Sequence, residues 1–259
     1  MSTRSRALRG LVAIPALLLV LYVFGMLGLY AWGLHLAPND IAPARTQAPA
    51  HIRTLWLRAE AQGVTRLPKH DPVTLLPRWY LDAKERMEQR RNDGNPTRKA
   101  QDLLGVVSRY VVYRGQGDDF LRSNRRHLAQ AAVRIHISRN WTLDDAVNTM
   151  LIEAEYGRGA IGIDAAAQAY FGVPAQRLRE DEALALIALL KGPSWYGFDC
   201  GKTRERFAQR FAQFVERLGE DASHWTADSA LQRLRPTDCA QRGKRRAQAS
   251  GAGATGQSR

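Results

Sequence analysis

Two polar side chains at helical spacing give the first indication of chemistry in this sequence. Arg126 and Gln130 are four residues apart, so on an α-helix they share one face and can reach the same cleft. A guanidinium can pair with two phosphate oxygens, whereas a glutamine amide carries no charge and is a poor ligand for Mg²⁺. The plain alternative is a solvated basic face at Arg126 and an ordinary exposed amide at Gln130.

Few other residues have the types and spacing that chemistry requires. Cys200 and Cys239 lack metal-ligand spacing and are too few for a disulfide framework, so no metal site is predicted. They can form one disulfide or stay as two buried thiols, and both alternatives remain open. His70 and Asp71 precede Pro72, and this order favours a turn closed by proline over a catalytic pair.

The elements that must position these side chains are predicted to be helices. Apolar residues recur at i, i+3, i+4 and i+7 in several segments. These apolar stripes are Ile52, Leu55, Trp56 and Ala59; Leu128, Ala131, Ala132 and Ile135; Val147, Met150, Leu151 and Ala154; and Phe207, Phe211, Phe214 and Leu218. Glu60 directly follows the first stripe. By default it is interpreted as a solvated carboxylate on the protein surface.

Further helices are expected over residues 164–170 and 180–190, and Thr142 with Asp145 forms a capping-box pattern. Residues 106–113 come closest to a strand, since they are rich in β-branched side chains, but they leave the assignment open. The predicted fold class is therefore mostly α.

An uncharged stretch near the N-terminus predicts a membrane anchor. Residues 11–34 carry no charge, and as a helix they rise about 36 Å, enough to cross a hydrocarbon core of ~30 Å. A cleaved signal peptide is the alternative, but its apolar part spans only ~7–15 residues. Three arginines precede the stretch, so residues 1–10 are expected in the cytoplasm. The rest of the chain then faces the periplasm of a bacterium with two membranes.

Charge and composition divide the remainder. Of the formal charge of +13, eight positive charges lie in the two termini, which carry no acidic residue. The +5 that remains describes a mildly basic domain and argues against a nucleic-acid binder. Residues 35–49 are rich in proline and predict a stalk, residues 50–239 one domain, and residues 240–259 a disordered basic tail. Binding of anionic lipid or nucleic acid by that tail is a minor alternative.

Residues 157–195 carry a resemblance to a known family. Residues 156–159, 165–172, 178–183 and 193–194 match, in order and spacing, the second half of the family 51 glycosyltransferase domain. Such domains polymerise peptidoglycan from lipid II in penicillin-binding proteins and in monofunctional transglycosylases. The resemblance implies a lysozyme-like, all-α transglycosylase domain behind a single membrane helix. It is strong over residues 126–218 and weak over the preceding 75.

The resemblance also implies roles for particular residues. Glu60 occupies the position of the catalytic base, which takes the proton from the acceptor hydroxyl. Arg126 falls on the family's pyrophosphate-binding motif, whereas Gln130 stands where that motif has a carboxylate. Arg158, in the glycine-flanked turn, is either a cation of the cleft or a turn residue. The family allows a divalent cation, and Gln130 weakens the case for one.

The departures from the family pattern leave two functions open. After Glu60, Ala61, Val64 and Leu67 stand where the family has Asp, Phe and His, and the next motif is recognisable only dimly in residues 94–97 and Gln101. One function is a membrane-anchored peptidoglycan glycosyltransferase with an altered, weakened site. The other is a catalytically inactive member that binds lipid II or glycan strands as a scaffold for cell-wall synthesis proteins. Tyr170, Phe171 and Glu182 are expected to be structural.

Overall fold

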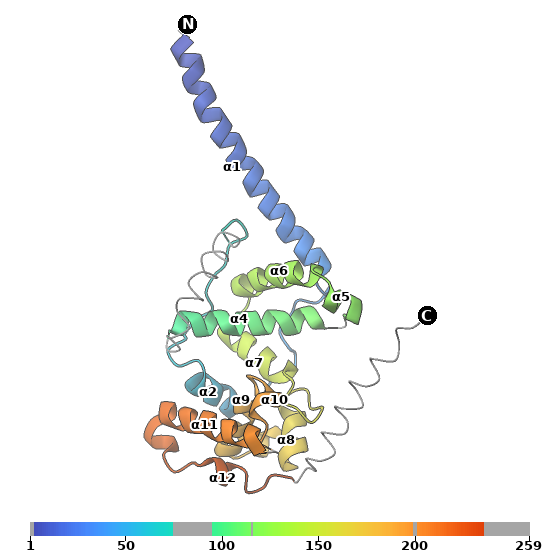
Figure 1. The fold of residues 1–259 in the computed structure, drawn as a ribbon, viewed down its shortest axis with the longest axis vertical. Coiled ribbons are helices and arrows are strands. Elements are labelled where there is room, and N and C mark those ends of the chain that lie inside the picture. The colour runs from blue at the N-terminus through green and yellow to red at the C-terminus, as the bar shows by residue number, and fades with distance from the viewer. Residues whose placement is uncertain (1–2, 75–94, 115, 199–200, 236–259) are drawn as a thin grey trace, which may run out of the picture. The chain divides into compact units, whose positions relative to one another are not determined.

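The computed structural model describes residues 3–74, 95–114, 116–198 and 201–235 (Figure 1). Across these ranges the chain is helical and forms no strand, apart from one isolated antiparallel bridge between Glu155 and Ile161. The mostly α prediction is confirmed. Cys200, Cys239 and the tail expected at 240–259 lie outside the described residues.

The chain divides into two compact units. The first comprises residues 1–45 and 63–150, and the second comprises residues 46–62 and 151–259. The first unit holds α1 (Thr3–Leu36), α4 (Pro96–Tyr113), α5 (Asp118–Arg122) and α6 (Arg125–Asn140). The boundary near residue 150 falls inside α7 (Leu143–Glu153).

The long first helix is the most apolar element of the first unit. The stretch Ile14–Leu36 is long and apolar enough to cross a membrane, and most of its side chains are exposed. The far end of α1 packs closely on α6: a Cβ added to Gly33 would lie 2.7 Å from the Cβ of Ala132. Glycine therefore lets the two helices approach, as small residues do where helices cross.

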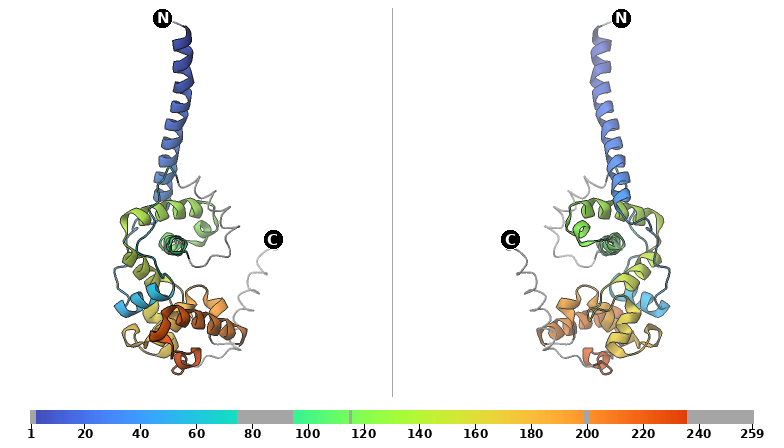
Figure 2. Two further views of the ribbon diagram at one scale, coloured as in Figure 1. Left: turned by 90° about the vertical axis from the view of Figure 1, so that its left-hand side faces the viewer. Right: turned by 90° about the vertical axis from the view of Figure 1, so that its right-hand side faces the viewer.

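The core of the first unit lies between α4 and α6, which cross in contact (Figure 2). The apolar side chains of α4 that are buried follow a helical repeat: Ala100, Leu103, Leu104, Val107, Val111 and Val112. Residues 106–113, left open between strand and helix, are thus helical, because their valines continue this stripe. Asn95 caps the helix by accepting a hydrogen bond of 2.9 Å from the Thr97 backbone N–H.

The start of α7 confirms the predicted capping box. The Asp145 carboxylate accepts from the Thr142 N–H at 2.9 Å, and the Thr142 hydroxyl accepts from the Asp145 N–H at 3.1 Å. Residues 37–49 form no helix or strand but are held in place by hydrogen bonds. Within the first unit, the Ala44 N–H donates to the Thr149 hydroxyl at 2.9 Å, and Arg114 donates to the carbonyl of Ala42 at 2.8 Å.

The second unit is built around one buried helix. In α9 (Glu180–Leu189), every residue from 181 to 189 is buried. The other helices of this unit are α2 (Ala50–Ala59), α8 (Ile163–Phe171), α10 (Pro193–Tyr196), α11 (Gly201–Leu218) and α12 (Ala227–Ala230), with 3₁₀ turns η1 (Ala175–Arg177) and η2 (Gly219–Ala222). The rings of Tyr170, Phe198 and Phe207 stack edge to face in its core, at centroid distances of 4.8 and 5.0 Å.

The helices predicted from the sequence in this unit are present. The stripe from Ile52 to Ala59 is buried in α2, and the three phenylalanines of α11 are buried with Leu218. Helix α8 ends at Gly172, whose φ of 73° is in the left-handed region that glycine adopts without strain. Tyr170 and Phe171 lie in the core, as expected.

Candidate functional site

Glu60 ends α2 and is held by arginines of α11. Its backbone N–H donates to the carbonyl of Trp56 at 2.8 Å, which makes it the C-cap residue. Its carboxylate accepts a hydrogen bond from Arg210, and its second oxygen lies 3.8 Å from a guanidinium nitrogen of Arg217. Arg217 also donates to the carbonyl of Ala59 at 3.2 Å. The end of α2 is therefore clamped to α11 by two cations.

The two members of this ion pair differ in burial. The side chain of Arg210 is 7% exposed, whereas that of Glu60 is 22% exposed. Arg210 stacks on Phe214 and donates to the carbonyl of Ala188 at 3.1 Å. Burial, together with the nearby charge of Arg217, lowers the pKa of Arg210 to about 10, so the guanidinium remains charged at neutral pH. Glu60 keeps an open side from which a hydroxyl could approach.

Arg126 and Gln130 lie on α6 in the first unit. The Gln130 amide donates to the carbonyl of Gly105 in α4 at 3.2 Å, so this side chain also ties two helices together. Arg126 is half-buried, and its Nε lies 3.4 Å from Nε2 of His127. Glu60 and Arg158 belong to the second unit. The site roles assigned to these four residues stay predictions.

The divalent cation that the resemblance allows can be tested against the donors present. No group of three His, Cys, Asp or Glu side chains comes together within the ranges that the structure describes. Gln130, at the position of the family's carboxylate, uses its amide as a donor to a carbonyl. These side chains do not form a ligand set for a divalent cation, which prefers carboxylate oxygens.

Arg158 occupies the glycine-flanked turn with a backbone φ of 54°, a left-handed conformation that is unusual for a residue other than glycine. Its guanidinium donates to the carbonyls of Ala169 at 2.8 Å and Arg235 at 3.0 Å. It also lies 4.2 Å from the ring centre of Tyr170. These two hydrogen bonds join the turn to α8 and to Arg235, the last residue that the structure describes.

Glu182 is structural, as expected from the sequence. It is fully buried at the start of α9, accepts a hydrogen bond of 3.0 Å from the Arg179 N–H, and is paired with Arg233. The Arg233 Nε donates to it at 2.6 Å, and this hydrogen bond raises the pKa of Arg233. No reacting group can approach a carboxylate that is enclosed in this way.

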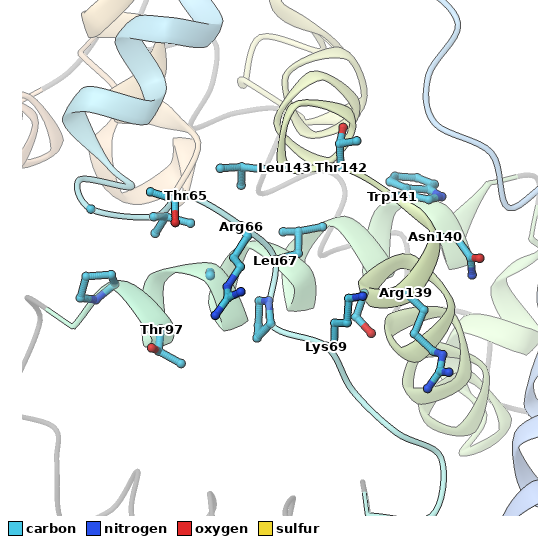
Figure 3. A pocket seen from close by; sticks show the side chains of 16 residues that line it. Thr65, Arg66, Leu67, Lys69, Thr97, Arg139, Asn140, Trp141, Thr142 and Leu143 are labelled. Atoms are coloured by element: carbon cyan, nitrogen blue, oxygen red, sulfur yellow. The ribbon is translucent and has the colours of Figure 1, made fainter.

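The first unit contains a pocket of about 830 Å³ that the sequence did not predict (Figure 3). Its walls come from residues 63–69, from the start of α4 and from the end of α6. Three basic side chains line it, Arg66, Lys69 and Arg139, beside apolar Leu67 and Trp141. In Figure 3 the labelled side chains of the pocket come from residues 65–69, from Thr97 at the start of α4 and from residues 139–143. Such a mixture suits an anionic group attached to an apolar or sugar body.

Arg210, which the sequence analysis did not single out, still leaves a weak signal in the sequence. Arg210 lies between Phe207 and Phe211 in the apolar stripe of α11, so a charged residue stands at a position that the periodicity buries. Such a residue needs a partner, because a buried charge without one is costly. The sequence alone does not show that this partner is Glu60, 150 positions away.

Comparison with known proteins shows that part of the chain is similar to one family. The family model described as "Transglycosylase" matches residues 106–218. The chain is 36% identical over 101 residues to the biosynthetic peptidoglycan transglycosylase of Salmonella agona, covering 38% of this chain and 42% of that protein. It is 34% identical over 86 residues to penicillin-binding protein 2D of Bacillus subtilis, covering 33% and 12%. It is 27% identical over 177 residues to penicillin-binding protein 1A of Rickettsia typhi, covering 67% and 20%. These matches thus span 12% to 42% of the relatives' lengths.

Proposed function

This chain belongs to the transglycosylase family (glycosyltransferase family 51), and from that premise we propose that it is a membrane-anchored, peptidoglycan glycosyltransferase-like protein with a weakened site. Its substrate would be lipid II, from which it transfers glycan in cell-wall synthesis. The observation that carries the proposal is the family match over residues 106–218, joined to a carboxylate at the base position, Glu60, that keeps an exposed side.

The proposed chemistry needs a base and an anion site. Glu60 would accept the proton of the acceptor hydroxyl while the oxygen attacks the anomeric carbon of the donor. The bond from that carbon to the pyrophosphate oxygen breaks, with inversion, and the pyrophosphate leaves with its electrons. Arg210 would hold the carboxylate in place through its hydrogen bond.

The leaving pyrophosphate gains charge and needs fixed cations. Arg126 is the cation that the family motif supplies. Arg158 contributes its charge less readily, since it donates to two backbone carbonyls.

Two features support slow transfer. A carboxylate already paired with a guanidinium is a weaker proton acceptor than an unpaired one. Gln130 brings no charge to the position of the family's carboxylate. Loss of a group from an electrostatic site typically lowers the rate by about 10²–10³-fold.

The proposed location follows from α1. Residues 11–34 would anchor the chain in the bacterial inner membrane, with residues 1–10 in the cytoplasm and the domain in the periplasm. The exposed apolar side chains of Ile14–Leu36 support this role, because an exposed apolar helix is stable in lipid. A substrate carried on a lipid then meets the domain without leaving the bilayer.

Polymerisation of fluorescent lipid II by the full chain in detergent micelles tests the proposal. We expect glycan polymer at a low rate, a loss of about 10²-fold or more in Glu60→Gln, and a faster rate in Gln130→Glu. Glu205→Gln, an exposed carboxylate of α11, is the matched control and should leave the rate unchanged. Polymer that forms equally well in Glu60→Gln would contradict the base role.

A second candidate, a catalytically inactive family member, is favoured by one specific observation. Both charged oxygens of Glu60 face arginines, and Gln130 donates to a carbonyl, so both positions have structural roles of their own. Such a protein would bind lipid II or glycan strands as a scaffold for cell-wall synthesis proteins. Saturable lipid II binding without polymer in any of these variants would select this function.

A further inference from the structure

Helix α6 has two sides with different partners. Arg125, Leu128, Ala132 and Arg139 recur at intervals of three, four and seven residues, so they form one line along the helix. We call this line the anchor stripe. Its centre contacts α1, where a Cβ added to Gly33 would lie 2.8 Å from the carbonyl oxygen of Leu128.

The opposite side of α6 faces α4. There Gln130 donates to the carbonyl of Gly105 at 3.2 Å, and Arg134 donates to the carbonyl of Gln101 at 3.2 Å. The basic residues of α6 are thus divided between two surfaces. The two arginines of the anchor stripe, Arg125 and Arg139, lie at the ends of the stripe, on either side of its contact with α1.

The contact with α1 fixes the depth of the anchor stripe. Gly33 follows Ile14 by 19 positions, which corresponds to about 28 Å along a helix and to the ~30 Å thickness of a hydrocarbon core. Trp32, next to it, is 54% exposed, and tryptophan is enriched where hydrocarbon meets headgroups. The stripe therefore lies at headgroup depth if α1 crosses the membrane.

A second contact brings the same side of the unit to α1. The Tyr22 hydroxyl donates to the carbonyl of Val73 at 2.7 Å, so a residue two positions after Asp71 also contacts α1. Asp71 in turn lies 3.4 Å from Arg139.

The charges on this side suit an anionic surface. Residues 125–140 contain no acidic side chain, and Arg122 adds an exposed cation just before α6. Asp71, at 3.4 Å from Arg139, is an acidic group that faces this region. The side chain of Arg139 remains 52% exposed in spite of that contact.

We propose that Arg125 and Arg139 of the anchor stripe bind the headgroup phosphates of anionic phospholipids in the leaflet next to the domain. Two arginines about 21 Å apart, on either side of a membrane helix, would hold α6 along the bilayer surface. The proposal rests on the proposed function only in requiring α1 to cross the membrane; it requires no glycan transfer.

Lipid binding to the full chain, measured by native mass spectrometry in detergent, tests the proposal. Phosphatidylglycerol and phosphatidylcholine are titrated separately, and the ratio of their dissociation constants for the first bound lipid is compared. We expect wild type to prefer phosphatidylglycerol, and R125Q/R139Q to lose about 25-fold of that preference, at about fivefold for each arginine. Raising the salt concentration should weaken the wild-type preference.

Matched variants make the result specific. R109Q/K202Q removes two exposed positive charges elsewhere and should keep the wild-type preference, as should R125K/R139K. An unchanged thermal melt shows that R125Q/R139Q is folded. The proposal is overturned if R125Q/R139Q retains the preference, or if R109Q/K202Q loses as much, since net charge alone would then explain it.

Alkaline extraction of membranes separates this proposal from the proposed function. A chain that is released by carbonate is not anchored by α1, and both the anchor and the lipid contact then fail. A chain that stays in the membrane and prefers phosphatidylglycerol, yet makes no glycan polymer, supports the lipid contact while contradicting the enzymatic proposal.

Discussion

Two arginine–glutamate pairs of the second unit have opposite patterns of burial. At the start of α9, Glu182 is fully buried and its partner Arg233 is 43% exposed. At the end of α2, Arg210 is the buried member, at 7% exposure, and Glu60 is 22% exposed. The residue types are the same, but the side chain that meets solvent is the arginine in one pair and the carboxylate in the other.

This inversion decides which carboxylate can take part in chemistry. Glu182 is enclosed and serves as a helix cap, so its charge is used within the fold. Glu60 presents an edge to solvent while its partner is fixed in the core by Phe214 and the carbonyl of Ala188. The pair at α2 thus orients a carboxylate, whereas the pair at α9 conceals one.

The largest effect is expected when the exposed member of the α9 pair is removed. Arg233→Met leaves the buried carboxylate of Glu182 without its strongest partner, so unfolding should become easier by about 3 kcal/mol. Glu182→Gln, which leaves only an exposed arginine unpaired and can still accept the capping hydrogen bond, should cost less. Chemical denaturation measures both, and equal losses would contradict the role given to burial.

A smaller loss is expected at the α2 pair. Glu60→Gln leaves the buried Arg210 with a neutral acceptor, and should cost about 2 kcal/mol. Arg210→Met removes the buried charge itself and leaves Glu60 beside Arg217, so it should cost less than Glu60→Gln. Asp221→Asn, in the exposed pair with Arg58, is the control and should change stability by less than about 0.5 kcal/mol. If Arg210→Met is the more damaging change, packing rather than charge holds the end of α2.

The smallest effect concerns a half-buried histidine of the first unit, His136. Burial lowers the pKa of His136 below its ordinary value of 6.5, so as pH falls the unfolded chain takes up this proton before the folded chain does. Stability should therefore fall as pH drops below about 6.5. His136→Gln should give a flatter dependence of Tm on pH between about 7 and 5. An unchanged slope would show that other groups control it.

The sequence by itself determined several of the helices and the resemblance to one family. Apolar spacing located α2, α6, α7 and α11, because this signal acts over a few neighbouring residues. The match in residues 157–195 pointed to the transglycosylase family, which the family model over residues 106–218 supports. The valines of residues 106–113 were ambiguous, since β-branching favours strands and only packing against α6 decides for a helix.

Only the tertiary structure decided what each charged side chain touches. Glu60 and Arg210 are 150 positions apart, and Arg158 donates to the carbonyl of Arg235, 77 positions away. Such contacts depend on how helices pack, and spacing along the chain carries no record of it. The burial of each partner, which separates a concealed carboxylate from an accessible one, arises from that packing alone.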